Sequence, residues 1–416
     1  MNILIITDSF PPEIKSSANL LFELSEDLVE SGHQVTVVTG FPKHYIDNID
    51  QRYKGKLFLR ERMNKIKAIR LLSISFIRHI PVIRGLDQFL LSVIFFLGGI
   101  NSGKQDVILT YSPPLPLGIS AYLLGKIKRA PFIFNVQDIF PQSVIDLGLL
   151  KSKVLIKISE AMEKFIYKKA RYITVHSEGN RKNIISKNID PKKVIVLHNW
   201  VDTDLIKPIK NQNNSFRAKN NLKDRFVVSF AGIMGFAQGL DVVINCAELL
   251  KSYKDILFLL IGDGIKKNGL IKRANDLNLD NIKFLPLQSK EVYPLVLEAS
   301  DICLVTLNKS VITPVVPSKL LSIMASGRPV VASMNLDGDT PKIIKNAKCG
   351  FYIEAGNSEQ LSEVILKLYN NSEIGVEFGR NGRKYAETHF SRKICIKKYE
   401  KLFSKAHIEV KNEKAN

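Results

Sequence analysis

A lysine near the start of a predicted helix is the clearest chemical signal in the sequence. Residues 314–319 read Pro-Val-Val-Pro-Ser-Lys and lead into an apolar helical pattern. Pro317 precedes Ser318, which is suited to cap this helix. Lys319 then lies in the first turn, where a cation opposes the helix dipole by about 0.3–1 kcal/mol. A bound diphosphate would reverse the sign of this effect. We therefore predict an anion site at Lys319, with a lysine that turns into solvent as the alternative.

A glycine-bearing loop separates a predicted strand from a predicted helix. It reads Gly-Ile-Met-Gly-Phe-Ala-Gln-Gly over residues 232–239. Glycines allow backbone N–H groups to approach a ligand, and a helix N-terminus favours an anion. The loop does not end in Gly-Lys-Ser/Thr, as a P-loop does, and it lacks the Gly-x-Gly-x-x-Gly dinucleotide fingerprint. Taken by itself, it fits a structural tight turn better than a binding loop.

Two carboxylates in the first half are candidates for contacting a substrate. Asp138 follows a predicted strand and would project from its carboxyl end, with capping of the next helix as the alternative. Glu13, in the first loop, could contact a substrate hydroxyl or remain a solvated charge. Asp337-Gly-Asp339 resembles an Asp-x-Asp metal motif, but we predict an ordinary turn there. The four cysteines and seven histidines lack metal-ligand spacing, so no metal is expected.

Length and composition limit the architecture. A chain of 416 residues exceeds one ordinary core, so two domains are expected. Apolar residues make up 45% and charged residues 24%, which is typical of a folded protein. Scattered cysteines and the absence of a secretory pattern at the N-terminus indicate a cytoplasmic protein. The most apolar window, residues 89–100, is shorter than the roughly 20 residues of a membrane span. A buried helix is expected there, and an interfacial segment is the second interpretation.

The chain is strongly basic, with a net charge of +20 and a pI near 9.6. Much of the excess lies between Lys43 and Arg84. Phosphate substrates, an anionic membrane or nucleic acid would each suit this charge, and a solvated face suits it equally well. We expect no nucleic-acid partner, because the basic residues lack an interleaved aromatic platform.

Apolar runs alternate with helical patterns through both halves, which predicts parallel sheets covered by helices on both faces. The first half has strand-like runs at residues 2–7, 34–39, 106–110, 131–136, 172–176 and 193–197. The second half has them at residues 226–231, 256–261, 282–285, 301–305 and 329–332. We predict a first domain at 1–204, a polar linker at 205–225, a second domain at 226–384 and a C-terminal helix at 385–410 that crosses back to the first domain. In doubly wound sheets of this kind, ligands bind at the carboxyl ends of strands.

Several stretches together resemble the retaining glycosyltransferases of family 4. Their order and spacing match that family over nearly the whole chain, at residues 11–13, 32–39, 197–204, 261–264, 299–301 and 324–331. A narrower resemblance is to the WbuB-like branch, which includes L-fucosamine transferases and is matched at residues 111–117, 136–141 and 316–320. The resemblance implies the α/β GT-B fold, in which two Rossmann-like domains face a cleft. The first domain would bind the acceptor and the second the nucleotide sugar.

The resemblance also implies an activity. It implies transfer of N-acetyl-L-fucosamine or another N-acetylated sugar from a UDP-sugar to a saccharide on polyprenyl pyrophosphate, in O-antigen, capsule or lipopolysaccharide biosynthesis. No cofactor or metal would be needed, and the enzyme would be peripheral on the inner face of the bacterial plasma membrane, an anionic surface. Two alternatives stay open: a UDP-sugar epimerase of the same fold, which needs no lipid acceptor, and an inactive transferase-like assembly partner.

Residue roles follow from the same resemblance. Lys319 would hold the leaving diphosphate in place of a metal, and Asp138 and Glu13 would orient the sugar or the acceptor. These three are the expected catalytic residues. The donor would contact Gly232, Gly235, Gln238, Gly239, Leu285, Pro286, Pro317, Ser318, Lys319 and Ser322.

The sequence departs from the broad family at several motif positions. The family's glutamate pair falls at Pro314 and Ser322, so Ser322 is expected to take over the ribose contact. Its pyrophosphate-binding arginine and lysine fall at Ile233 and Gln238. The histidine often found before Asp138 is Gln137, and the paired glycines of the first loop are serines, at positions 16 and 17. We expect backbone groups around residues 285–286 to meet the uracil.

Overall fold

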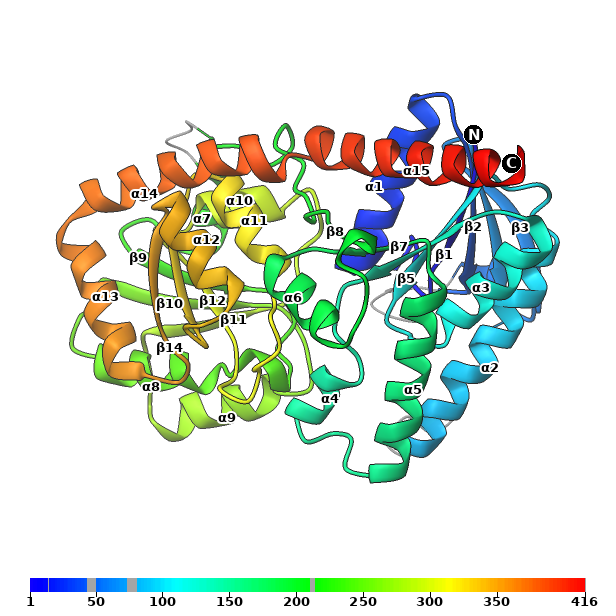
Figure 1. Ribbon diagram of the computed structural model, residues 1–416. Helices are drawn as coiled ribbons and strands as arrows, with labels where there is room; N and C mark the ends of the chain where they lie inside the picture. The colour runs from blue at the N-terminus through cyan, green and yellow to red at the C-terminus, as the bar shows by residue number, and fades with distance from the viewer. Residues whose placement is uncertain (14, 43–49, 73–80, 210–213, 416) are drawn as a thin grey trace. The chain divides into compact units, whose positions relative to one another are not determined.

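The computed structural model describes residues 1–13, 15–42, 50–72, 81–209 and 214–415. The chain forms two compact units, Met1–Asn199 with Lys393–Asn416, and Trp200–Arg392. Each unit is built on one sheet with helices on both faces (Figure 1). None of the helices in these described ranges combines the length and apolarity that a membrane span requires.

The first unit contains an eight-stranded sheet in the order β3-β4-β2-β1-β5-β6-β7-β8. Its strands are β1 (Asn2–Ile6), β2 (Gln34–Gly40), β3 (Phe58–Met63), β4 (Ile66–Leu71), β5 (Val107–Ser112), β6 (Phe132–Val136), β7 (Tyr172–Val175) and β8 (Val194–Val196). The strands pair in parallel, except that β3 runs antiparallel to β4. The order reverses between β1 and β5, so the loops that follow these two strands lie at the switch point of the sheet.

Helices cover both faces of this sheet. They are α1 (Ser16–Glu30), α2 (Pro81–Ile100), α3 (Leu117–Lys128), α4 (Gln142–Asp146), α5 (Lys153–Lys169), α6 (Glu178–Ser186) and α15 (Arg392–Ala415). Phe134 of β6 packs in one apolar core with Phe95 of α2 and Ile166 of α5. The next residue, Asn135, points to the opposite face, where its amide donates to Tyr399 Oη of α15 at 2.8 Å. The C-terminal helix therefore packs on the first unit.

The second unit contains a six-stranded parallel sheet in the order β11-β10-β9-β12-β13-β14. Its strands are β9 (Phe226–Ala231), β10 (Ile256–Ile261), β11 (Ile282–Leu285), β12 (Ile302–Thr306), β13 (Val330–Met334) and β14 (Gly350–Glu354). Its helices are α7 (Ser215–Lys219), α8 (Asp241–Leu249), α9 (Lys267–Asp276), α10 (Tyr293–Glu298), α11 (Ser318–Ala325), α12 (Asp339–Ala347), α13 (Ser358–Asn370) and α14 (Ser372–Tyr385). This is the 3-2-1-4-5-6 order of a doubly wound fold, which reverses between β9 and β12.

The two sheets confirm the predicted class of two doubly wound domains, while several boundaries differ. Part of the predicted linker is folded, because Phe216 and Leu222 are buried in the core of the second unit. The second unit continues beyond residue 384, since Phe390 is buried in another of its cores. The C-terminal helix begins at Arg392 rather than at 385, and it extends to Ala415.

Two strands of the basic run were not foreseen. β3 and β4 form a hairpin within the segment that we interpreted only by its charge. Exposed and half-buried residues alternate along β3, which lies at the edge of the sheet. Arg70 of β4 is nevertheless fully buried, so it does not belong to a solvated face. The residues at 43–49 and 73–80 of this run lie outside the described residues.

Candidate functional site

The candidate site of the second unit lies at its switch point. The loop after β9 and the loop after β12 leave neighbouring strands at their carboxyl ends. The two loops meet, because Asn308 donates its N–H to the carbonyl of Ala237 at 2.7 Å. The first helix after the β12 loop is α11, which carries Lys319 in its first turn, as predicted.

The side chain of Lys319 reaches from α11 to the end of β9. Its Nζ lies 3.4 Å from the centroid of the Phe230 ring. A Cβ added to Gly232 would stand 3.1 Å from the same Nζ, so this glycine leaves the ammonium its room. Among the described residues, no carboxylate pairs with Lys319. Desolvation therefore acts alone and lowers the pKa of Lys319 to about 7. A half-buried, desolvated ammonium without a counter-ion is a site suited to an anion.

Backbone contacts hold the glycine loop against the loop after β10. Gly232 donates to the carbonyl of Ile261, and Met234 donates to that of Asp263, each at 2.8 Å. A Cβ on Gly262 would stand 1.9 Å from the carbonyl oxygen of Gly232, and Gly262 has φ +149°. Only glycine allows this approach. The Gly-Asp-Gly motif at 262–264 therefore packs against the glycine loop of residues 232–239.

The turn itself uses part of the predicted donor-binding set. Gln238 folds back and its Oε1 accepts the N–H of Gly235 at 3.0 Å. Gln238 Oε1 and the Gly235 N–H are thus used within the loop itself. Gly239 has φ +58°, and a Cβ added to it would stand 2.9 Å from the Cα of Asn308. At the start of the 3-10 turn Phe236–Gln238, the first N–H groups have no partner inside the turn.

The start of α11 corrects one local prediction. Ser318 is the first helical residue, and Pro317 occupies the N-cap position without a side-chain cap. The hydroxyl of Ser318 is exposed instead of capping the helix. One turn further on, Ser322 lies beside the phenol of Tyr293 in α10. Tyr293 is a site neighbour that the sequence did not indicate, because it comes from another segment of the chain.

The predicted uracil contacts lie at the end of β11. The carbonyl of Leu285 accepts the N–H of Gly262 at 3.1 Å, so this group is used within the sheet. The carbonyl of Pro286 accepts Gln288 Nε2 at 2.8 Å, and proline has no N–H to offer. Each of these two carbonyl oxygens keeps a second lone pair that can accept a hydrogen bond from the uracil base.

Asp337 and Asp339 form a turn, as we predicted. Asp337 donates its N–H to Asn335 Oδ1 at 3.0 Å, and α12 begins at Asp339. The described residues contain no cluster of three or more His, Cys, Asp or Glu side chains placed to hold a metal ion.

A second cluster lies at the switch point of the first unit. Glu13 is buried, accepts Ser9 Oγ at 3.0 Å and pairs with Lys15 Nζ at 3.0 Å. The alternative of a solvated loop charge is therefore wrong. Asp8 directly follows β1 in the same loop. Burial raises the pKa of Asp8 to about 6; the charge of Lys15 opposes this shift, and that of Glu13 adds to it. Asp8 was missed, although its place after a buried strand was a usable signal.

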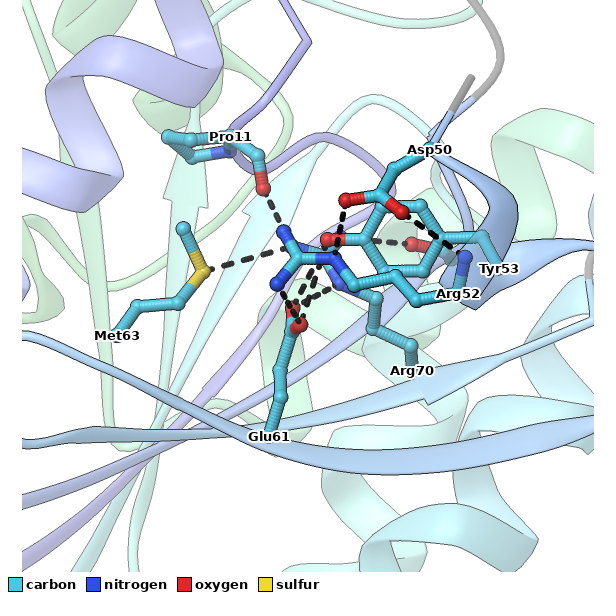
Figure 2. Close-up of polar contacts among 8 residues, drawn as sticks. Pro11, Asp50, Arg52, Tyr53, Glu61, Met63 and Arg70 are labelled. Atoms are coloured by element: carbon cyan, nitrogen blue, oxygen red, sulfur yellow. Dashed lines mark hydrogen bonds and ion pairs between the residues drawn. The ribbon is translucent and has the colours of Figure 1, made fainter.

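Figure 2 shows how a buried arginine supports this loop. The guanidinium of Arg70 donates to the backbone carbonyl of Pro11 and pairs with the carboxylate of Glu61. It also donates to the carbonyl of Gly40 at 3.3 Å, and the Tyr53 ring lies 5.2 Å away. The loop that carries Glu13 is thus tied to β3 and β4.

Asp138 lies in the loop at the carboxyl end of β6, where it was expected, and it is exposed. It does not cap α4, whose N-cap position is Pro141. Although its carboxylate reaches solvent, desolvation raises its pKa. The charges of Asp138 and Asp8 both act on the phenol of Tyr111, whose pKa burial raises well above the usual value. The neighbouring Gln137 amide donates to Asn199 Oδ1 at 3.1 Å, and Asn199 Nδ2 donates back at 2.7 Å.

Comparisons with known proteins cover both units of the chain. The family model described as Glycosyltransferase Family 4 matches residues 17–205, and that described as Glycosyl transferases group 1 matches residues 211–385. WcaI of Escherichia coli, a glycosyl transferase named for colanic acid biosynthesis, is 26% identical over 79% of this chain and 82% of its own. An Escherichia coli enzyme named UDP-Gal:alpha-D-GlcNAc-diphosphoundecaprenol alpha-1,3-galactosyltransferase is 23% identical over 66% of this chain and 68% of its own.

A solved structure has the same fold. HepE of Anabaena, crystallised in complex with UDP, superposes with a TM-score of 0.73 and 16% identity, covering 97% of this chain and all of its own. The two family models together account for both units described above. The chain therefore belongs to glycosyltransferase family 4 and is a retaining, nucleotide-sugar-dependent transferase of the GT-B fold.

Proposed function

We propose that this enzyme transfers a sugar from a UDP-sugar to a saccharide carried on polyprenyl pyrophosphate, in the synthesis of O-antigen, capsule or a related polysaccharide. The proposed UDP-sugar donor rests on one observation, the desolvated ammonium of Lys319 at the switch point of the second sheet. Among the described residues, this ammonium has no counter-ion. A diphosphate supplies the missing negative charge. The complex of HepE with UDP supports a uridine nucleotide.

The geometry favours stabilisation of a leaving group. During transfer, the bond between the anomeric carbon and the diphosphate oxygen breaks, and its electron pair leaves with UDP. Negative charge grows on the diphosphate, and Lys319 is fixed in advance to meet it. The N–H groups at the start of the turn Phe236–Gln238 offer further donors beside it. Ser322 lies one turn along α11, beside Tyr293, and would contact the ribose.

The acceptor half rests on the first unit. Asp138, Glu13 and Asp8 follow the carboxyl ends of β6 and β1, where polar groups of an acceptor or of the donor sugar would bind. The acceptor oxygen forms the new bond to the anomeric carbon on the face that UDP leaves, and its proton passes to the departing diphosphate oxygen. The name of the Escherichia coli galactosyltransferase, which specifies a diphosphoundecaprenol acceptor, supports a lipid-linked saccharide. Membership of the WbuB-like branch would make N-acetyl-L-fucosamine the donor sugar, and the enzyme would work peripherally at the anionic inner face of the plasma membrane.

A binding and transfer experiment tests the proposal. Calorimetry should show micromolar binding of UDP and much weaker binding of GDP. A panel of UDP-sugars is then incubated with a short-chain polyprenyl-pyrophosphate saccharide, and the anomeric configuration of the product is read by NMR. Transfer with retention supports the proposal. Interconversion of UDP-sugars without an acceptor would establish the epimerase alternative, and UDP binding without turnover would favour an inactive assembly partner.

A further inference from the structure

One helix face of the first unit exposes a long apolar stripe. Leu86, Phe89, Val93, Leu97 and Ile100 of α2 follow one another at intervals of three or four residues, so they share one side of the helix. Val93 and Leu97 are 53% and 55% exposed. The opposite side of the same helix packs into the core through Phe95. A soluble amphipathic helix normally presents polar residues on its outer side.

The two helices next to α2 continue this surface. α3 packs beside α2, and α5 packs beside α3. Figure 1 shows these three helices over the same part of the first unit. α3 adds the exposed side chains Leu123 and Ile127. α5 adds Val154, Ile158 and Phe165, again at helical spacing along one side. We call the exposed side chains of α2, α3 and α5 the apolar face.

Cations accompany the apolar face. The exposed charged residues of α5 are Lys153, Lys157, Lys164, Lys168, Lys169 and a single acid, Glu160. Lys126 is exposed on α3 between its two apolar positions. Lysines at such places can lay their stems along apolar surface while their ammonium groups reach outward. An apolar face with a basic border matches the interface of an anionic bilayer, which offers acyl chains and phosphates together.

The second unit lacks this pattern. In its described part, exposed large apolar side chains are scattered, and no helix carries more than one of them, for example Leu249 on α8 and Val376 on α14. Single exposed apolar residues are ordinary, whereas a contiguous face on three neighbouring helices marks an interaction site.

We propose that the face formed by α2, α3 and α5 docks on an anionic lipid bilayer, with the stripe of α2 at the level of the acyl chains and the lysines of α5 at the phosphates. The inference rests on the proposed function, because an acceptor on a polyprenyl carrier has to be met at a membrane. It assigns the docking surface to defined residues, while the basic run of residues 43–84 is not needed for it.

Vesicle co-sedimentation of the full chain tests the location. The probes are phosphatidylcholine vesicles with and without phosphatidylglycerol, at low and at moderate salt. The wild type should bind only the anionic vesicles, and salt should weaken binding. Val93→Asn with Leu97→Asn should reduce binding by about tenfold or more, since two exposed apolar anchors are lost. Lys157→Gln with Lys164→Gln should also reduce binding and flatten its salt dependence.

Matched changes outside the face provide the controls. Val376→Asn on α14 and Lys272→Gln on α9 alter equally exposed residues of the second unit and should leave vesicle binding unchanged. Wild-type binding by the Val93/Leu97 variant would overturn the proposal. So would a dimer of the wild type in sedimentation equilibrium that this variant dissociates, because the face would then belong to a second copy of the chain.

The same variants separate this inference from the proposed function. UDP binding and transfer to a detergent-soluble, short-chain acceptor should be unchanged in the Val93/Leu97 variant. If vesicle binding depends on the face but no transfer occurs with any UDP-sugar, the proposed function fails and the docking surface stands. If transfer occurs but the variant still binds vesicles, the docking surface fails and the proposed function stands.

Discussion

The ammonium of Lys319 lies 3.4 Å from the ring centroid of Phe230. The two residues come from α11 and β9, and the neighbouring strands β9 and β12 bring these segments together. The aromatic face offers partial compensation for lost hydration, but it does not neutralise the charge. The site is therefore arranged before any ligand binds, and an anion that arrives there needs no large rearrangement of the protein.

Removal of this cation should affect binding and chemistry together. We expect Lys319→Ala to lose measurable UDP binding in calorimetry and to lower kcat by about 10²–10³-fold, the usual effect of removing one preorganised charge-stabilising group. Lys309→Ala is the matched control, because Lys309 is an exposed lysine of the same β12–α11 loop. Equal losses in both variants would show that the effect is general electrostatics and not the site.

The affinity for UDP should depend on pH through the same side chain. The pKa of Lys319 is about 7, so a bound diphosphate, which favours the ammonium, raises this pKa. Binding should be strongest below pH 7 and weaken as the pH rises above it, with uptake of protons near pH 8. Calorimetry in buffers of different ionisation enthalpy measures this uptake. Lys319→Arg, which stays protonated, should abolish the proton uptake, and persistence of uptake would assign it to another group.

The lysine should also destabilise the empty protein. Its pKa falls from 10.5 in the unfolded chain to about 7 in the folded one, so the unfolded state binds more protons between these values. The penalty is present in full below pH 7 and disappears as the pH rises toward 10.5. Lys319→Met should therefore increase the free energy of unfolding at pH 6 to 7, and the gain should shrink by pH 10. Urea titrations at both ends of this window measure the difference.

Two glycines in opposite environments test the packing of residues 262–264 against the glycine loop of residues 232–239. Gly262→Ala should destabilise the protein by several kcal/mol, about the range for overpacking combined with backbone strain, because the new Cβ meets the Gly232 carbonyl. Gly269 lies in α9 with nothing within 4 Å of an added Cβ. Gly269→Ala should instead stabilise by about 0.5–1 kcal/mol through helix propensity. Chemical denaturation compares the two, and a similar sign in both would contradict the packing described.

The buried arginine of the first unit should act on transfer without acting on the donor nucleotide. Arg70→Met removes the buried cation that pairs with Glu61 and, among the described residues, leaves this carboxylate only the exposed Arg52 at 3.8 Å and the phenol of Tyr53. Removal of one side of a buried pair costs about 3–5 kcal/mol. The substitution also releases the Pro11 carbonyl, so the loop of Glu13 loses its attachment. We expect a lower kcat/KM for the acceptor with unchanged UDP affinity. Arg70→Met combined with Glu61→Leu should recover stability but not the acceptor effect.

The local pattern of the sequence was sufficient for the repeated β-α units and for Lys319 in the first turn of α11. Such features depend on neighbouring residues, since strand and helix periodicity and the first turn of a helix are local properties. It was also sufficient for the turn at Asp337. It was not sufficient for the cap of α11, where Pro317 took the position that Ser318 was expected to fill, because the backbone entry into a helix is set by the loop before it.

Only the tertiary structure decided what lies beside each motif. The close approach of Gly262 and Gly264 to Gly232 and Met234 was not predictable from the sequence. Arg70 belongs to the basic run, for which a solvated face was one of the interpretations, whereas the fold buries it against Glu61. The Phe230 ring under Lys319, the Tyr293 phenol at Ser322 and the apolar face of α2, α3 and α5 share this origin. Each depends on contacts between segments far apart in the chain, and the order of strands in the sheets, which no local pattern specifies, determines which segments meet.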